Sequence, residues 1–276
     1  MISPWILQTG LCFSLALIAL GCLQSDRLTL RRLGLWLILA TLLTALWFLF
    51  QHPLALILGL LLWFSLPIGQ AIIISRRLRF GRHRSLQATA FPPDEFPDLP
   101  EASAELRALG FHELGDYWLP GAPLRQGYRL FCHPDHRTYG ATAVVTTDGI
   151  SLLYLIFISR APKGSLWMTW DYPFTYALRT PPDLFVYRCL EADSIETLLH
   201  QHLAFLHAND LSPNHLLPAD PSGAEPFFAR IFTETLDYNL RIGLLRPQTP
   251  SGDPLRYSWR GTAYLSWQVL REMVLG

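Results

Sequence analysis

Three apolar stretches decide the fold of this chain: PWILQTGLCFSLALIALGCL (residues 4–23), LGLWLILATLLTALWFLF (33–50) and LALILGLLLWFSLPIGQAIIIS (54–75). None of the three contains Asp, Glu, Lys or Arg. Each is about as long as an α-helix must be to cross roughly 30 Å of hydrocarbon at about 1.5 Å per residue. The sequence therefore predicts three membrane-spanning helices, which form a transmembrane anchor over residues 1–84.

The formal net charge of the 276-residue chain is zero, but the charge is distributed unevenly. Up to Arg84 the sequence has eight arginines and one acidic residue, Asp26, which gives a net charge of +7. The part from Ser85 onward therefore carries a charge of −7. Because binding to DNA or RNA depends mostly on neutralising phosphates, this acidic part is a poor nucleic-acid binder. We expect no nucleic-acid partner, and we assign the arginines to the membrane surface.

The arginines also predict which way the chain crosses the membrane. Three of them follow the first span and five follow the third, whereas residues 1–10 and 51–53 contain none. Since cytoplasmic flanks carry the excess of Lys and Arg, we expect the amino terminus outside and the C-terminal domain in the cytoplasm. Only one of the 22 basic residues is lysine, which is typical of GC-rich bacterial genomes, so we expect a bacterial inner-membrane protein with the lipid bilayer as its first partner. The residues expected at the membrane interface are Trp5, Trp36, Trp47, Arg76, Arg77 and Arg79.

Residues 85–100 are expected to form a Pro-rich linker between the anchor and a folded domain. The segment FPPDEFPDLP (91–100) has four prolines in ten residues. Proline-rich chain adopts an extended, semi-rigid conformation of about 3 Å per residue. The segment therefore predicts a spacer that holds the domain away from the bilayer.

Residues 101–276 read as a cytoplasmic α+β domain, with a sheet first and helices after it. The pattern predicts a short helix over 101–109 that ends at Gly110, followed by strands and then by three long helices. The predicted strands cover residues 113–118, 127–133, 139–147, 150–159, 165–172 and 184–190. The predicted helices cover 193–208, 224–241 and 261–275, and residues 246–254 form a Pro-rich loop. Because the links between strands are short, we predict an antiparallel sheet. Strand 150–158 is apolar on both faces, which indicates a central strand.

The segment WMTWDYPFTY (167–176) is the best candidate for an interaction site. Packing in the core is the ordinary explanation for such an aromatic run. However, Pro173 cannot donate a hydrogen bond to a neighbouring strand, which favours an edge strand, and aromatic-rich edges are where partners dock. The residues proposed to bind the partner are Trp167, Trp170, Tyr172, Phe174 and Tyr176.

Two other groups of residues have the chemistry of a metal or catalytic site. Residues 132–136 (CHPDH) combine Cys, His and Asp, but they lie at a predicted turn, and no second Cys/His pair follows at a recognised spacing. His200, His202 and His207 lie on one predicted helix, where solvated histidines are the ordinary interpretation. The sequence has no nucleophile elbow, phosphate-binding loop or dinucleotide fingerprint. We therefore predict no catalytic residue, no metal and no cofactor.

These observations predict a membrane-anchored interaction or assembly protein, such as an accessory subunit of a larger inner-membrane complex. Its partner would be another membrane protein or a second copy of the chain. Two alternatives stay open. One is a membrane-proximal enzyme that uses the Cys132–His136 region, and the other is a ligand-sensing domain with a pocket under its helices.

Overall fold

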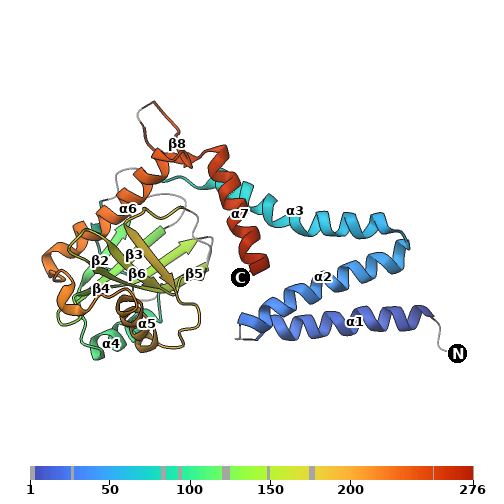
Figure 1. Ribbon diagram of the computed structural model, residues 1–276, viewed down its shortest axis with the longest axis horizontal. Coiled ribbons are helices and arrows are strands. Elements are labelled where there is room, and N and C mark those ends of the chain that lie inside the picture. Colours follow the sequence, from blue (N-terminus) through green and yellow to red (C-terminus); the bar gives the residue numbers. More distant parts are fainter. Residues whose placement is uncertain are drawn as a thin grey trace. The chain divides into compact units, whose positions relative to one another are not determined.

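The computed structural model of the protein describes residues 4–25, 28–81, 85–92, 95–119, 125–147, 150–173, 178–250 and 252–275 (Figure 1). Contacts between residues divide the chain into two compact units. One unit is Ser75–Thr262, and the other combines Met1–Ile74 with Ala263–Gly276. The division therefore falls inside two helices, near the end of the third predicted span and near the start of the last helix of the chain.

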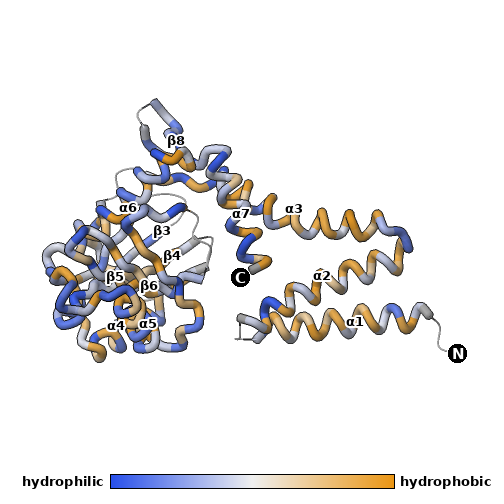
Figure 2. The backbone as a smooth tube through the Cα atoms, viewed as in Figure 1, coloured by the Kyte–Doolittle hydropathy of each residue, from blue (hydrophilic) through white to orange (hydrophobic). Residues whose placement is uncertain are grey.

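The three predicted spans are helices: α1 (Pro4–Leu23), α2 (Leu28–Phe50) and α3 (Pro53–Arg77). All three are long and apolar enough to cross a membrane, and Figure 2 shows the hydrophobic character along them. Helix α2 begins five residues before the predicted span and includes Arg31 and Arg32. A helix need not stop where the apolar stretch stops, because arginine is itself a good helix former. Pro53 is the first residue of α3, where its missing N–H costs no hydrogen bond.

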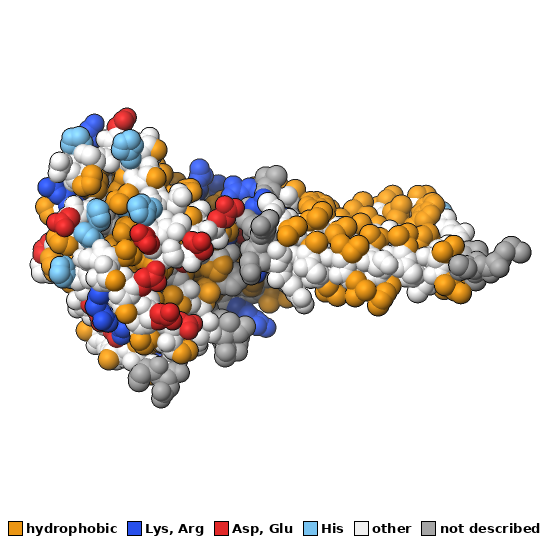
Figure 3. All heavy atoms as spheres, turned by 90° about the horizontal axis from the view of Figure 1, so that it is seen from below, with side chains coloured by type: hydrophobic (Ala, Val, Ile, Leu, Met, Phe, Trp, Pro, Cys, Tyr) orange, Lys and Arg blue, Asp and Glu red, His pale blue; other side chains and the backbone are white. Residues whose placement is uncertain are grey.

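Close contact between α1 and α2 depends on a glycine. A Cβ atom at Gly34 would lie 2.9 Å from the Ala19 carbonyl oxygen and 2.9 Å from the Leu23 Cγ atom, so only glycine permits this approach. Ala19 is fully buried there, and small residues at such contacts are typical of membrane helices. Elsewhere the helices expose hydrophobic side chains, which cover much of their surface in Figure 3.

The residues predicted at the membrane interface occupy helix ends with one exception. Trp5 lies in the first turn of α1 and Trp47 in the last turn of α2, and both are exposed. Trp36 is also exposed but lies in the third turn of α2. Arg76 and Arg77 form the last turn of α3, and Arg79 follows it and donates a hydrogen bond to the Leu78 carbonyl oxygen (2.9 Å).

The second unit contains a seven-stranded sheet whose strands follow one another in sequence order. The strands are β1 (Gln87–Ala88), β2 (His112–Leu119), β3 (Arg125–His133), β4 (Thr138–Thr147), β5 (Ile150–Arg160), β6 (Leu166–Trp170) and β7 (Leu184–Arg188). All neighbours are antiparallel except β6 and β7, which are parallel. The prediction of a wholly antiparallel sheet is therefore wrong for this pair. The connection over residues 171–183 is long enough to return the chain to the same end of the sheet, as a parallel pair requires.

Helices cover both faces of the sheet (Figure 1). Helices α4 (Leu99–Ala108) and α5 (Ile195–His207) cover one face, and α6 (Ala224–Arg241) covers the other. The remaining elements are the short helices η1 (Pro213–His215) and η2 (Pro221–Gly223), the hairpin β8 (Leu245–Pro247) and β9 (Leu255–Tyr257), and α7 (Trp259–Leu275). Gly110 follows α4 with φ +89°, as predicted for a residue that ends a helix. The hairpin was not predicted and lies in and beside the expected loop over 246–254.

Strand β5 is central, as its two apolar faces predict. It lies between β4 and β6. Ile156 and Ile158 belong to the core shared with α6, whereas Leu155 and Phe157 belong to the core shared with α4 and α5. Successive side chains of a strand point to opposite faces, so one strand supports both halves of the core.

The Pro-rich segment packs against the sheet and is not a free spacer. Phe91 and Phe96 are buried and pack with Trp118 of β2; the rings of Phe91 and Trp118 meet edge to face with centroids 4.9 Å apart. A Cβ atom at Gly127 of β3 would collide with the Phe91 ring, so the glycine makes room for it. The prolines suggested an exposed chain, but the two phenylalanines gain more from burial than the segment gains from staying solvated.

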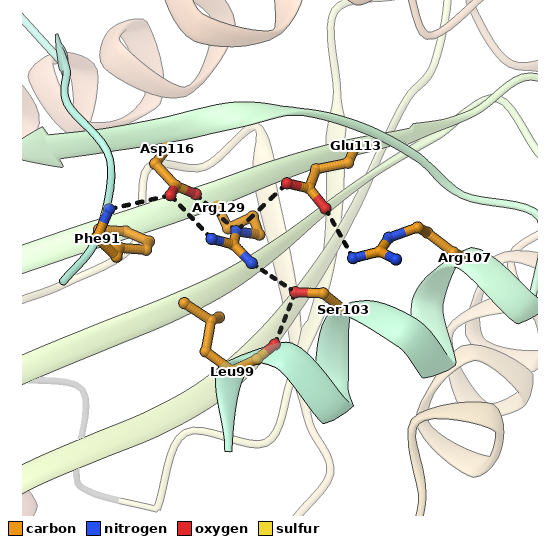
Figure 4. A network of polar contacts seen from close by, with 7 residues as sticks. All are labelled: Phe91, Leu99, Ser103, Arg107, Glu113, Asp116 and Arg129. Carbon is orange, nitrogen blue, oxygen red and sulfur yellow. Dashed lines mark hydrogen bonds and ion pairs between the residues drawn. The ribbon is translucent and has the colours of Figure 1, made fainter. Parts of the chain in front are cut away.

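An ion-pair network fixes the Pro-rich segment and α4 to the sheet (Figure 4). Arg129 donates two parallel hydrogen bonds to Asp116, from Nε to Oδ1 (2.6 Å) and from Nη2 to Oδ2 (2.9 Å). It also donates from Nη1 to the Ser103 hydroxyl on α4 (3.0 Å). Asp116 in turn accepts from the Phe91 backbone N–H (3.1 Å). The bond to Asp116 raises the pKa of Arg129, so this cation stays charged.

Replacing Phe91 tests whether the segment belongs to the folded domain. We expect Phe91→Ala to destabilise the protein by about 3 kcal/mol, because a buried aromatic ring would leave a cavity beside Trp118. The neighbouring change Thr89→Ala, at an exposed side chain, should have little effect. Chemical unfolding of the full chain in mild detergent measures both changes. Equal stability of the two variants would mean that the segment is the spacer that its composition suggested.

Candidate functional site

Among the described residues, strand β7 is an edge strand of the sheet. It is the last strand of the seven, and its side chains Phe185 and Tyr187 are 42% and 38% exposed. The sequence placed the edge one strand earlier, and that prediction is wrong because β6 pairs with β5 on one side and β7 on the other. Pro173 lies three residues after the end of β6, so its missing N–H interrupts no strand pairing.

Four aromatic side chains form one continuous cluster beside this edge, which we call the β7 aromatic cluster: Trp167, Phe185, Tyr187 and Phe205. Trp167 stacks on Phe185 with centroids 4.4 Å apart and an interplanar angle of 15°. Phe205, on α5, contacts both Trp167 (5.1 Å) and Tyr187 (5.5 Å). Trp167 is only 8% exposed, whereas Phe185, which stacks on it, and Tyr187 are exposed.

The other predicted partner-binding residues do not join this cluster. Trp170 is 8% exposed and faces α6, on the opposite side of the sheet. Tyr172 packs on Tyr154 on that same side, with centroids 4.8 Å apart, and burial raises the pKa of the Tyr172 hydroxyl. Phe174 and Tyr176 lie outside the described residues. The alternation of side chains along β6 thus separates Trp167 from Trp170.

A chain of polar side chains lies buried between the sheet and α5. The Thr138 and Ser159 hydroxyl oxygens are 2.8 Å apart. Ser159 Oγ then contacts His202 Nε2 (3.0 Å), and His202 Nδ1 contacts Thr169 Oγ1 (2.9 Å). All four side chains are completely buried. The chain therefore joins β4, β5, β6 and α5 through hydrogen bonds.

His202 corrects the interpretation of the helix histidines. His200 and His207 are exposed, as expected, but His202 is not. A sequence signal for this existed. His202 lies four residues after Leu198 and four before Leu206, both buried, so it shares the apolar stripe of α5.

Ser159 and His202 lie as close together as a catalytic nucleophile and its general base, but a substrate cannot reach them. Burial lowers the pKa of His202 to about 3, so the imidazole is neutral and bonds to hydroxyls on both nitrogens. Since neither Ser159 nor His202 reaches the surface, no substrate can approach the hydroxyl oxygen. The arrangement orients α5 on the sheet, and satisfied buried polar groups of this kind specify one packing.

The Cys132–His136 segment does not converge on one point. Cys132 and His133 are neighbours on β3 and face opposite sides of the sheet; burial raises the pKa of the Cys132 thiol and lowers that of His133. His133 Nε2 lies 3.1 Å from the Leu109 carbonyl oxygen and donates to it, while Nδ1 accepts from the His136 backbone N–H (3.2 Å). Both ring nitrogens of His133 are thus occupied. Among the described residues no group of three or more His, Cys, Asp or Glu side chains is placed to hold a metal ion.

Acid should destabilise the protein through His202. Its pKa is lower in the folded protein than its ordinary value of 6.5, so the unfolded state binds the proton first. The contribution of neutral His202 to the free energy of unfolding is therefore complete above pH 6.5 and is lost as the pH falls from there toward 3. His133, whose pKa is also lowered, acts in the same direction. Each pKa unit corresponds to about 1.4 kcal/mol.

Chemical unfolding of the full chain at pH 7 and pH 5 measures this loss. His202→Gln keeps hydrogen-bonding groups but does not titrate, so the difference between the two pH values should shrink. Ser159→Ala should lower stability at both pH values and leave the difference unchanged. An undiminished pH effect in His202→Gln would show that other groups cause it.

No protein-family model, curated protein or solved structure matches this chain.

Proposed function

We propose that this chain is a membrane-anchored interaction protein that docks a partner protein at the β7 edge. It would serve as an accessory subunit of a larger complex in a bacterial inner membrane, with its amino terminus outside and its α+β domain in the cytoplasm. Three helices that are long and apolar enough to cross a membrane support the anchor. The distribution of arginines along the sequence supports the orientation.

The observation that carries this proposal is the β7 edge with its aromatic cluster. In the part of the chain that the structure describes, no strand pairs with the outer side of β7. An exposed strand edge offers backbone donors and acceptors to an added strand of a partner. Phe185 and Tyr187 are suited to be anchors because they are exposed and aromatic, and because Phe185 stacks on Trp167 while Tyr187 packs on Phe205.

The enzyme alternative has less support. An enzyme needs reactive groups that converge on a point that a substrate reaches. Cys132 and His133 face opposite sides of the sheet, and the Ser159–His202 pair is closed from solvent. The partner proposed here is another membrane protein. If the purified chain associates only with itself, the partner is a second copy of the chain.

Removing the two exposed rings of β7 should release the partner. We expect Phe185→Ala with Tyr187→Ala to weaken binding about 30-fold, since truncating an interface anchor costs about 2 kcal/mol or more. Trp259→Ala, at a tryptophan that is 80% exposed elsewhere, is the matched control and should bind normally. Co-purification in mild detergent, quantified by mass spectrometry, measures what remains bound.

Trp170→Ala serves as the folding control. It should lower the stability of the domain, because the Trp170 ring belongs to the core beneath α6. Two outcomes for the β7 double variant would contradict docking at this edge. If the β7 double variant keeps its partner while remaining folded, the edge is not the docking site. If it unfolds, the two rings are structural and the proposal fails.

The orientation has its own test. In a variant without Cys12, Cys22, Cys132 and Cys189, single cysteines replace His52 and Ser222, which are both exposed. A membrane-impermeant thiol reagent should label position 52 in intact cells and position 222 only after lysis. Labelling of position 222 in intact cells would overturn the cytoplasmic location.

A further inference from the structure

A cavity of about 230 Å³ lies between α6 and the sheet, on the face opposite the β7 aromatic cluster. Its walls come from the α6-facing side chains of β3, β5 and β6, including Tyr128, Ile156 and Met168, and from α6 itself, including Ile231. The cavity is partly open to the surface, so a small molecule can enter it. Concave, largely apolar sites of this kind are where proteins bind small molecules.

The walls are apolar, aromatic and uncharged. In the described part of the chain, no Asp, Glu, Lys, Arg or His side chain lines the cavity. Aromatic rings line several sides, among them Trp170, Tyr172 and Phe232. A charged ligand would lose its hydration without gaining a counter-charge, whereas a flat apolar ring would meet ring faces and edges.

One pair of polar side chains in the lining would orient a bound ligand. The Gln126 side-chain amide donates to the Tyr154 hydroxyl oxygen (3.1 Å), and both residues line the cavity. A few placed polar groups within an apolar lining are what small-molecule sites use to orient a ligand. Gln126 and Tyr154 thus place polar atoms within an otherwise largely apolar lining.

The chain immediately after α3 supplies part of the wall. Leu78 and Phe80 line the cavity, one and three residues after Arg77, the last residue of the helix. Phe80 exchanges two backbone hydrogen bonds with Leu255 (2.9 and 2.8 Å), which hold this segment in place. The wall is thus continuous in sequence with a helix that is long and apolar enough to cross a membrane.

We infer that this cavity binds an uncharged, mostly apolar small molecule built on a single ring system. Its volume exceeds the roughly 150 Å³ of an apolar cavity that accepts benzene and falls just below the range of about 300–1,000 Å³ for drug-sized ligands. The ligand therefore has the size of one or two fused rings. This inference goes beyond partner docking, because the β7 cluster lies on the other face of the sheet.

Methyl NMR of the full chain in detergent micelles tests the inference through Met168. The chain has three methionines, Met1, Met168 and Met273, and of these Met168 lines the cavity. With ¹³C-methyl methionine, titration with indole should shift the Met168 signal saturably and leave the other two nearly unchanged. Benzoate, which has as many non-hydrogen atoms but carries a charge, should bind at least about tenfold more weakly.

Substitutions in the cavity complete the test. Ile231→Phe and, separately, Thr235→Leu reduce the space and should each weaken indole binding about tenfold. Leu190→Phe, at a residue that does not line the cavity, should bind like the parent protein. The methyl spectrum shows directly whether each variant is folded. If one of the two filling variants does not fold, the other still tests the inference.

Three results would overturn the inference: no saturable shift at Met168, equal shifts at all three methionines, or unchanged binding in a folded filling variant. The β7 double variant distinguishes this inference from the proposed partner docking. Phe185→Ala with Tyr187→Ala should leave the indole titration unchanged whether or not it releases a partner. Loss of indole binding in that variant would contradict the placement of the ligand under α6.

Discussion

The two-sided burial of β5 is the constraint on which the α+β domain depends. This strand has apolar side chains on both faces, so neither face can be left to water. Helix α6 covers one face, and α4 with α5 covers the other, so the sheet is the middle one of three layers. The strands beside β5 follow the same arrangement, because each of them also has one face toward α6 and one toward α4 and α5.

Polar groups that this burial encloses specify how the layers align. Hydrophobic packing alone is non-directional, but the hydrogen bonds of His202 to Ser159 and Thr169 fit only one position of α5 on the sheet. Arg129 does the same for α4 and the Pro-rich segment by way of Asp116 and Ser103. The domain thus uses buried polar contacts for alignment and apolar contacts for stability.

The two proposed binding sites lie on opposite faces of the sheet. The β7 aromatic cluster lies on the α5 side, where the sheet ends without a further described strand. The cavity lies on the α6 side and reaches the segment that leaves α3. Strand β6 contributes to both, since Trp167 faces the cluster and Trp170 faces the cavity. A ligand and a partner on opposite sides of one strand would share its side chains without competing for them.

The sequence by itself determined whatever depends on local pattern. The three apolar helices, the six longer strands and α6 follow from runs, alternation and turn residues, whose physics acts between near neighbours along the chain. Tertiary structure alone decided what depends on distant neighbours. It made β7 the parallel edge, buried His202, drew Phe91 onto the sheet and left a cavity beneath α6. A residue's burial and a strand's place in a sheet are set by the surfaces that meet it, and those surfaces come from segments that no local pattern brings together.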